Sequence, residues 1–440
     1  MNRSLHRLIV IPFFVLIAQF AHSQFLMDMI DTTKDLGKGM LSVYHRFDRI
    51  QISGYLQPQF QVASQEGIQS FAGGNFAPNS NNRFMIRRGR IRFDYVHLDK
   101  QSLPVLQFVF QFDGSERGVF IRDFWGRVWD PKWKTLAFTM GMFARPFGYE
   151  INLASADRET PERGRMSQTL MKTERDLGAM LTYEPRKPDA KLKYLRIDIG
   201  AFNGQGLTGP GEYDNYKDFI GQIYLKPYEI GEHVQLSGGV QYFNGGIAQT
   251  SKYVYSMATD GSGTKYFAVD SSESNINTKS PRIYSGANAQ IKYLHKWGAT
   301  ELRGEYWQGT QTATALTTET PGTLPLEGAI PSPLYRRKFN GAFFYFLQNI
   351  INLKHQIVVK YDWYDPNTDV SGMNIGKPGS NVNFANIKYD TWGFGYIYYA
   401  TPNLKFVVYY DLVHNESTQA PNFTHDVKDN VFTFRMQFRF

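Results

Sequence analysis

Four arginines within six residues, Arg87, Arg88, Arg90 and Arg92, form the densest basic run on any strand that the sequence predicts. Side chains at alternate positions of a strand share one face and lie about 6.6–6.8 Å apart. The alternation therefore places Arg88, Arg90 and Arg92 on one face and Arg87 on the opposite face. If the shared face lines a water-filled interior, the three arginines offer a passing anion a series of weak sites.

A second interpretation makes these arginines structural. Asp94 lies on the same predicted strand and Asp113 on the next one, so these carboxylates could pair with the arginines across the interior. The basic run would then belong to a charged wall and would say nothing about selectivity. The sequence leaves both interpretations open.

Another charged segment, residues 148–173, mixes acidic and basic side chains. Its charged residues are Asp157, Arg158, Glu159, Glu162, Arg163, Arg165 and Lys172. Opposed charges around a narrow passage create a transverse field and order the water inside it. We therefore expect a constriction built from Arg158, Glu159, Glu162, Arg163 and Arg165. A solvated surface loop of mixed charge is the alternative.

Motifs for catalysis or metal binding are weak throughout the sequence. No G-x-S-x-G motif occurs, and the histidines are scattered without the spacing of metal ligands. Residues 365–369 with Gly372 faintly resemble a calcium loop, but the closing glutamate is missing. Residues 261–265 lack the spacing of a phosphate-binding loop. We expect no enzyme activity, no bound metal and no cofactor.

The composition indicates the kind of scaffold that holds these residues. Aromatic residues make up 15% of the chain, with 27 Tyr and 34 Phe, although the mean hydropathy is −0.39. A transmembrane β-barrel needs this combination, because its outer face contacts lipid while its interior is wet. Cysteine is absent, which excludes disulfides and thiol chemistry. The basic residues are dispersed along the chain, so we expect no nucleic-acid partner.

The first residues have the pattern of a secretory signal peptide. Arg3 and Arg7 precede an apolar stretch over residues 8–20, and residues 21–23 form a small-x-small cleavage site. The stretch is short for a spanning helix, which needs about 20 apolar residues. We expect residues 1–23 to be removed on export to the outer membrane of a Gram-negative-type bacterium; an uncleaved anchor is the alternative. Residues 24–49 have helical spacing and are interpreted as a periplasmic lead-in.

From residue 50 onward the apolar residues recur with a period of two, which predicts an all-β chain of about sixteen strands. The predicted spans are 50–62, 83–98, 104–113, 117–129, 134–147, 174–184, 191–204, 216–228, 231–244, 281–294, 298–311, 333–347, 353–365, 386–400, 403–414 and 427–440. Short connections alternate with mostly longer polar ones, as short periplasmic turns and long extracellular loops do. No blade-like repeat supports a soluble propeller. We predict a transmembrane antiparallel β-barrel over residues 50–440.

The last predicted strand places an aromatic or apolar residue at every second position and ends with Phe438 and Phe440. A soluble strand can show the same alternation. A terminal phenylalanine on such a strand resembles the signal that the outer-membrane assembly machinery recognises. We therefore expect Phe438 and Phe440 to serve in assembly.

Three segments resemble the phosphate-selective porin O and P family. Residues 141–148 read GMFARPFG and resemble its G-x-F-x-x-P-F-G stretch, residues 174–178 resemble its E-R-D-x-G stretch, and residues 202–206 resemble its F-N-G-x-G stretch. The resemblance implies a sixteen-stranded, usually trimeric porin whose third extracellular loop folds inward, which here is the segment 148–173. Well-known members carry a basic ladder that leads to a lysine-rich constriction. No such lysine cluster is evident in this sequence, so the resemblance leaves phosphate specificity open.

The resemblance and the pattern together predict an outer-membrane porin for passive diffusion of small, preferentially anionic solutes, with phosphate as one candidate. The expected partners are outer-membrane lipids, the assembly machinery and further copies of the chain in a homotrimer. Two other functions stay open: a barrel scaffold for secretion or surface assembly, and a barrel hydrolase.

Overall fold

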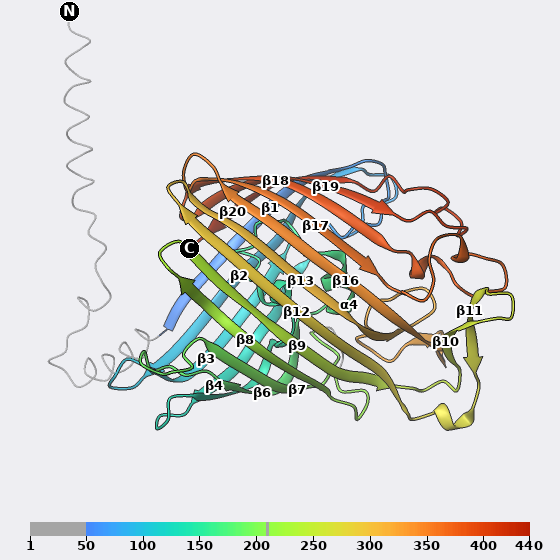
Figure 1. Ribbon diagram of the computed structural model, residues 1–440, viewed down its shortest axis with the longest axis horizontal. Helices are drawn as coiled ribbons and strands as arrows, with labels where there is room; N and C mark the ends of the chain where they lie inside the picture. The colour runs from blue at the N-terminus through green and yellow to red at the C-terminus, as the bar shows by residue number, and fades with distance from the viewer. Residues whose placement is uncertain (1–49, 208–210) are drawn as a thin grey trace, which may run out of the picture. The chain divides into compact units, whose positions relative to one another are not determined.

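The computed structural model of the protein describes residues 50–207 and 211–440. The predicted signal peptide (1–23) and the predicted lead-in (24–49) lie outside the described residues. In the described part of the chain, sixteen strands form a closed antiparallel barrel, in which successive strands pair and β20 pairs back with β1 (Figure 1). The predicted all-β barrel of about sixteen strands is thus confirmed. Its strands are β1 (Ile50–Ala63), β2 (Asn82–Leu98), β3 (Pro104–Ser115), β4 (Gly118–Trp129), β5 (Leu136–Ala144), β6 (Arg175–Tyr183), β7 (Leu195–Phe202), β8 (Asp218–Ile230), β9 (Val234–Ala248), β12 (Lys279–His295), β13 (Gly298–Ala313), β16 (Leu334–Asn349), β17 (His355–Asp365), β18 (Tyr389–Thr401), β19 (Leu404–Asn415) and β20 (Val431–Arg439).

The two faces of each barrel strand differ in polarity, as β20 illustrates. Thr433, Arg435 and Gln437 are buried inside the barrel, whereas the alternating aromatic residues lie on the outer face, where Phe438 and Phe440 are exposed. A soluble protein buries its apolar face, so this inverted arrangement requires an apolar medium around the barrel. The role of Phe438 and Phe440 in assembly stays a prediction.

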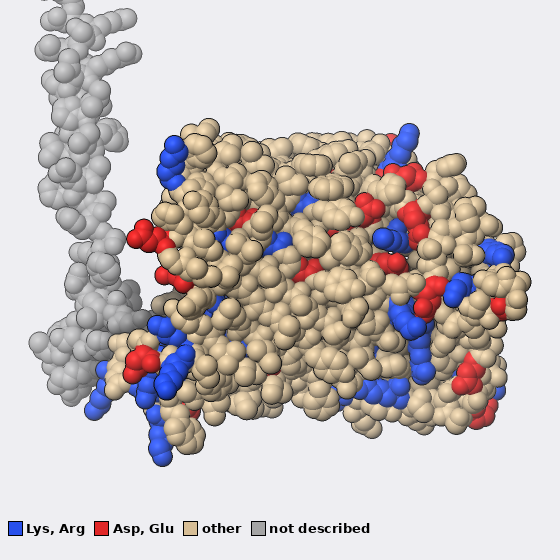
Figure 2. Space-filling model, in the orientation of Figure 1, with Lys and Arg blue, Asp and Glu red and all other residues tan. Residues whose placement is uncertain are grey.

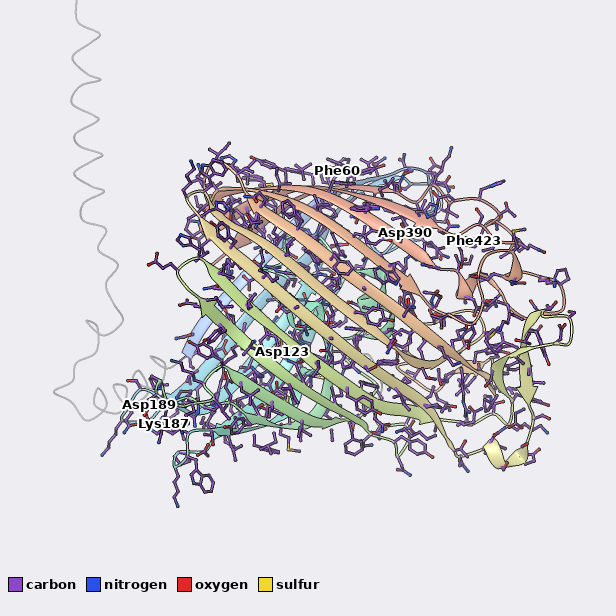
Figure 3. All side chains as sticks on the ribbon, viewed as in Figure 1. Phe60, Asp123, Lys187, Asp189, Asp390 and Phe423 are labelled. Carbon is purple, nitrogen blue, oxygen red and sulfur yellow. The ribbon has the colours of Figure 1, made fainter. Side chains whose placement is uncertain are left out.

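The two ends of the barrel differ in the length of their connections (Figure 1). One end carries mainly turns of two to six residues, together with one longer turn, residues 184–194. The other end carries mainly long loops, with a single two-residue connection at 116–117 between β3 and β4. Lysines and arginines gather at the short-turn end, where Lys187 and Asp189 lie (Figures 2 and 3). In outer-membrane barrels the short turns lie on the periplasmic side, so the predicted location would place this end in the periplasm.

The long loops contain structure of their own. Strands β10 (Val254–Thr259) and β11 (Lys265–Asp270) form a hairpin, and β10 runs parallel to the start of β16. Strands β14 (Leu326–Glu327) and β15 (Ile330–Pro331) form a smaller hairpin, and three short 3-10 helices, η2 (Glu273–Asn275), η3 (Gly372–Asn374) and η4 (Phe384–Asn386), lie in the same loops. A small apolar cluster joins these loops through Phe267, Tyr335, Val370, Ile375, Val382, Ile387 and Ala420. No helix among the described residues is long and apolar enough to cross a membrane.

Several predicted strands extend further than the observed ones, and the spans 134–147 and 191–204 show why. The span 134–147 ends at Ala144, because Pro146 has no N–H to donate to a sheet and Phe147 is buried inside the barrel. The span 191–204 begins only at Leu195, because the preceding residues belong to the long turn 184–194. In that turn Arg186 donates to the carbonyls of Pro104 and Asp130 and so ties three short-end turns together.

Candidate functional site

Residues 145–174, which connect β5 to β6, lie inside the barrel; we call this segment the inward loop. It contains two short helices, α3 (Tyr149–Asn152) and α4 (Arg165–Leu170). Its apolar side chains pack against aromatic residues that project inward from the wall, and the combined cluster includes Phe147, Ile151, Met166, Leu170, Phe202, Phe243, Tyr284, Trp307, Phe339 and Tyr364. Phe147 sits 4.8 Å from Trp307, ring centroid to ring centroid. This packing fixes the loop against one side of the interior.

Basic side chains on the same side bind the backbone of the inward loop. Lys405 of β19 donates its Nζ to the carbonyls of Ala156 (2.9 Å) and Arg158 (3.1 Å). Arg435 of β20 donates to the carbonyl of Pro161 at 2.7 Å. Carbonyls that would otherwise be buried without a partner are therefore satisfied from the wall.

Two acidic residues of the loop are bound from the same side. Arg303 of β13 forms a two-bond pair with Glu159, at 2.8 and 3.0 Å. Glu150 accepts hydrogen bonds from Tyr345 of β16 (2.8 Å) and from the Ser167 hydroxyl (2.6 Å) within the loop. The barrel wall thus binds side chains of the loop as well as its backbone.

Glu162 connects the inward loop to β2 and to β20, the two strands that pair with β1 where the barrel closes. Its carboxylate accepts hydrogen bonds from Arg87 and Arg88 of β2 and from Arg435 of β20, at distances between 2.7 and 3.1 Å. Burial raises the pKa of the Glu162 carboxyl, but the charges of Arg87, Arg88 and Arg435 outweigh burial and hold this pKa well below its usual range. The carboxylate is therefore charged at all ordinary pH values and anchors the loop continuously.

Arg158 has an unusual environment for a charged residue. It is 2% exposed, and none of its three guanidinium nitrogens has a hydrogen-bond partner in the described structure. Burial is the main reason why its pKa falls to about 9, and the neighbouring charges of Arg163 and Arg88 lower it further. This predicted constriction residue is enclosed behind the loop and does not line the cavities described below.

The facing of Arg87 differs from the prediction. On β2, Phe84 is 84% exposed and Ile91 is 46% exposed, so both side chains face outward. The outward-facing residues therefore have even numbers near Phe84 but odd numbers near Ile91. The alternation therefore shifts by one residue between them, and Arg87 and Arg88 both reach Glu162 inside the barrel. The prediction that Arg87 faces outward is wrong, because a strict period of two does not hold through this part of β2.

Strand β4 contains a bulge at the same level. Gln111 of β3 pairs with Asp123, whereas the next residue, Phe112, pairs with Ile121, so Arg122 has no cross-strand partner. An extra residue of this kind turns two consecutive side chains to one face. Arg122 and Asp123 are both buried inside the barrel (Asp123 is labelled in Figure 3).

The predicted arginine row Arg88, Arg90 and Arg92 lies inside the barrel, and each member pairs with a carboxylate. Arg88 binds Glu162 at 2.7 Å, Arg90 binds Asp113 at 2.7 Å, and Arg92 binds Asp94 at 2.6 Å. The pairing with Asp94 and Asp113 is the one that the structural interpretation of these arginines named. Arg90 also donates to the hydroxyls of Tyr55 and Ser155. Ion pairing and exposure to the interior therefore coexist in this row.

The open part of the interior lies mainly between the inward loop and strands β1 to β8, with Arg439 of β20 and Asn288 of β12 at its edges. A cavity of about 710 Å³, the outer chamber, opens toward the long-loop end and is lined partly by residues 65–75 and by Asp429. A second cavity of about 330 Å³, the middle chamber, is lined by the beginning of β1, by residues 152–157 and by Arg439. A third cavity of about 440 Å³, the inner chamber, lies against β4 to β8.

Arginines occupy the borders between these chambers. Arg90, Arg122 and Arg163 line both the outer and the middle chamber. Arg92 and Arg175 line both the middle and the inner chamber. A solute that moves between the outer and the middle chamber passes the first set, and one that moves between the middle and the inner chamber passes the second.

The middle chamber has the most one-sided charge of the three. Its lining contains six arginines, Arg90, Arg92, Arg122, Arg163, Arg175 and Arg439, and one acidic residue, Asp157. Asp113 and Glu174, which pair with Arg90 and Arg122, line the outer chamber instead. The carboxylates thus stand on the outer side of the border, and the positive potential increases from the outer to the middle chamber.

The carboxylate of Glu174 contacts three of the arginines at the chamber borders. It accepts hydrogen bonds from Arg122 and from Arg163, and Arg175 lies 3.2 Å away. Burial raises the pKa of the Glu174 carboxyl, but Arg163, Arg122 and Arg175 together bring this pKa well below its usual range. Its constant negative charge allows three arginines to stay close together at the border.

The structure distributes the predicted constriction residues over two locations. Arg163 lies at the border between the outer and middle chambers, and Glu162 and Arg165 line the outer chamber. Arg158 and Glu159 lie on the far side of the loop, against the wall. The role of these residues in a constriction therefore stays a proposal, and it rests mainly on Arg163.

Sequence reasoning missed Arg122 and Arg175 at the chamber borders. A signal for Arg122 was present: the adjacent charged pair Arg122-Asp123 interrupts an alternating apolar strand, as Arg87-Arg88 does on β2. Two polar neighbours inside a barrel strand cannot both face inward without a bulge. Arg175 lies within the E-R-D-x-G stretch, whose sequence does not by itself indicate which of its side chains faces the interior.

Comparison with known families confirms the resemblance that the motifs suggested. Residues 334–440 match the family described as phosphate-selective porin O and P. The matched segment begins at β16 and includes the last five barrel strands, whereas the motifs lie between residues 141 and 206. No curated protein matches the chain.

Solved structures of porins share the fold at low sequence identity. OprB of Pseudomonas putida aligns with a TM-score of 0.55 and 8% identity over 93% of this chain and 98% of its own. The outer membrane channel DcaP of Acinetobacter baumannii aligns at 0.51 and 11%, over 89% of this chain and 97% of its own. An anion-selective porin from Comamonas acidovorans aligns at 0.52 and 10%, over 89% and 99%. At such identities these alignments establish the barrel fold alone.

Proposed function

We propose, from the family match of residues 334–440 and the charge of the interior, that the protein is an outer-membrane porin through which small anionic solutes diffuse passively. The observation that carries the anionic preference is the middle chamber, with six arginines against one aspartate in its lining. A charged, narrow passage with low-dielectric walls raises the local concentration of ions of opposite sign. The porin from Comamonas acidovorans that shares the fold is described as anion-selective, which agrees with this direction of preference.

The path of the anion follows from the shared linings. An anion enters the outer chamber, meets Arg90, Arg122 and Arg163 at its inner border, and continues past Arg92 and Arg175. Most of these arginines already hold a carboxylate, so each offers a spare donor rather than a full binding site. Weak sites in series allow an ion to enter and also to leave, which conduction requires.

Phosphate is one candidate among the permeating anions. Guanidinium groups match the geometry of phosphate oxygens and can bind them through two parallel hydrogen bonds. The basic residues of the middle chamber are all arginines; Lys172, by contrast, lines the outer chamber. A lysine-rich constriction therefore has no counterpart in the middle chamber, and we expect selection for anions in general more strongly than for phosphate.

The proposal includes three further elements. We expect export with removal of residues 1–23, insertion by the outer-membrane assembly machinery with Phe438 and Phe440 as its signal, and association into homotrimers as the family implies. The exposed aromatic and aliphatic side chains on the outer face support contact with membrane lipid.

Conductance measurements in planar bilayers test the proposal. In a KCl gradient, the purified protein should give stable open steps and a reversal potential of the sign that indicates chloride preference. A protein that serves as a scaffold would give no stable steps, and a reversal potential that indicates potassium preference would contradict the proposed path.

A triple variant identifies the residues responsible. Changing Arg90→Gln, Arg122→Gln and Arg163→Gln removes the positive border while keeping polar side chains, so the reversal potential should shift toward potassium. The shift should be larger at 0.1 M than at 1 M salt, because the Debye length falls from about 10 Å to about 3 Å. Arg117→Gln is the matched control, since Arg117 is 80% exposed at the short β3–β4 connection.

A further inference from the structure

The inner chamber differs in character from the other two. It is lined by apolar side chains as well as by arginines, whereas the outer and middle chambers are lined mainly by charged and small polar residues. Its volume of about 440 Å³ falls in the range of cavities that hold small organic molecules. It adjoins the middle chamber through Arg92 and Arg175, which line both.

One wall of the inner chamber is apolar and rigid. Trp125 of β4 lines the chamber and packs against the large apolar cluster of the interior. Phe143 and Met180, which also line it, belong to that cluster and are each 3% exposed. The guanidinium carbon of Arg92 lies 6.0 Å from the centre of the Trp125 ring. Because the cluster holds these side chains in place, Trp125 offers its remaining apolar surface to the chamber at little cost in conformational entropy.

The second feature of the chamber is a guanidinium group without a carboxylate partner. Arg92, Arg175 and Arg196 pair with Asp94, Asp123 and Asp198 respectively. Arg127, in contrast, forms no ion pair in the part of the chain that the structure describes.

Aromatic and hydroxyl groups hold Arg127 in place. It donates its Nε to the Thr139 hydroxyl at 2.6 Å, and its guanidinium carbon lies 5.2 Å from the Trp125 ring and 5.7 Å from the Trp129 ring. A cationic head held between two aromatic faces keeps its remaining donors for an anion.

We propose, on the basis of the proposed porin function, that the inner chamber is a binding site for small organic anions that join one carboxylate or phosphate group to a planar apolar body. The anionic group binds Arg127 and the apolar body lies against Trp125. A chloride or inorganic phosphate ion gains only the charge interaction, because it has no apolar surface to bury. The site therefore favours organic anions over inorganic ones after both have passed the same arginine border.

The test uses block of the chloride current by three probes: benzoate, acetate and inorganic phosphate. Each probe is added to the side of the short turns, and the concentration that halves the single-channel current is measured. Benzoate should act at a roughly three- to tenfold lower concentration than acetate, the factor expected from one aromatic contact. Equal concentrations for benzoate and acetate would overturn the inference.

Two variants assign the contacts. Trp125→Leu should raise the half-blocking concentration of benzoate to that of acetate and leave the reversal potential unchanged. Arg127→Gln should raise it for both carboxylates. Trp133→Leu, in the exposed turn between β4 and β5, is the matched control and should change nothing. If Trp125→Leu does not fold, Trp125→Phe, which retains a smaller ring, should give an intermediate value; a wild-type value in either folded variant would overturn the inference.

The failure of this inference can be told apart from the failure of the proposed function. A protein without open steps, or with potassium preference, contradicts the porin path itself. In that case, calorimetric titration of benzoate into the detergent-solubilised protein and into Trp125→Leu still decides whether the chamber binds organic anions. A chloride-preferring channel without a benzoate–acetate difference contradicts the inner-chamber site alone.

Discussion

Basic residues line both flanks of the inward loop, but they have different partners there. On the flank that faces β13 and β16 to β20, they bind the loop itself: Arg303 binds Glu159, while Lys405 and Arg435 bind loop carbonyls. On the flank that faces β2 to β8, Arg90, Arg92 and Arg175 pair with carboxylates of the wall. Arg87, Arg88 and Arg122 on this flank pair with loop carboxylates, and all six arginines line the chambers.

The comparison shows that residue type alone does not identify a permeation path. A buried arginine whose donors are used up by the loop holds the constriction in place. An arginine that pairs with a neighbouring carboxylate and still faces a cavity keeps donors for a solute. Whether an arginine binds the loop or faces a cavity depends on where the nearest carboxylate of the wall lies. That position depends in turn on strand register and on bulges.

The largest effect should follow from breaking the connection between the two flanks at Glu162. Glu162→Gln leaves the buried Arg88 and Arg435 and the half-buried Arg87 without their shared counter-charge, and loss of one partner of a buried pair costs about 3–5 kcal/mol. The inward loop should then leave its position in part of the molecules, so single-channel conductance should rise and become noisy. Glu66→Gln, at an exposed position of the outer chamber, is the control; steady wild-type conductance in Glu162→Gln would show that the packed apolar cluster alone holds the loop.

A smaller effect on stability, of opposite sign, is expected at Arg158. This residue lies on the flank that faces β13 and β16 to β20, which we call the closed flank. Its guanidinium is buried without a hydrogen-bond partner, and replacing such a charge by an apolar residue is often neutral or stabilising by about 1–4 kcal/mol. Arg158→Met should therefore preserve or raise the thermal unfolding temperature in detergent. Arg435→Met, which removes the hydrogen bonds of one guanidinium to Gln59, Pro161 and Glu162, should lower it. Equal losses in the two variants would mean that Arg158 contributes to stability as a charge.

The pKa of Arg158 gives this contrast a pH dependence. Burial lowers its pKa in the folded protein to about 9, so the folded state binds the proton less tightly than the unfolded state does. The destabilisation is complete below pH 9 and is relieved as the pH rises above 9. The difference in stability between Arg158→Met and the wild type should therefore shrink between pH 8 and pH 10, and a constant difference would contradict the assignment.

The smallest effect concerns Asp429, in the loop before β20 that borders the outer chamber. Burial raises the pKa of its carboxyl to about 6, against the opposing charge of Arg165. Because the folded-state pKa is raised, the carboxyl gains a proton as the pH falls through 6, and the outer chamber loses one negative charge. Chloride preference should increase slightly between pH 7 and pH 5. The change should be absent in Asp429→Asn; a variant that titrates like the wild type would assign the effect to another group.

The sequence predicted the barrel well because a barrel strand has a local signature. Thr433, Arg435 and Gln437 alternate with aromatic residues, and this pattern alone indicates one wet and one lipid-facing side. Predicted strand ends differ from the observed ones where a proline or a long turn intervenes, as at Pro146 and residues 184–194.

The candidate site was predicted less completely because it depends on contacts between distant parts of the chain. The pattern placed Arg88, Arg90 and Arg92 inside the barrel. It could not show that Arg88 forms an ion pair with Glu162, or that Arg90 lines two chambers. A strict alternation also gave the wrong direction for Arg87 and gave no reason to select Arg122, since both depend on a local shift of alternation. Adjacent charged pairs inside an alternating strand are the one local signal of such shifts.

Cysteine accessibility tests most directly whether solutes pass along one flank of the inward loop only. The chain contains no cysteine, so single substitutions report without background. Ala154→Cys places a thiol at an exposed position of the middle chamber, and Thr160→Cys places one six residues further along the loop, on the closed flank, where Thr160 is 3% exposed beside Tyr345. A negatively charged methanethiosulfonate reagent should lower both conductance and chloride preference in Ala154→Cys and leave Thr160→Cys unchanged. Rapid modification of Thr160→Cys with loss of current, together with an unaffected Ala154→Cys, would contradict the account.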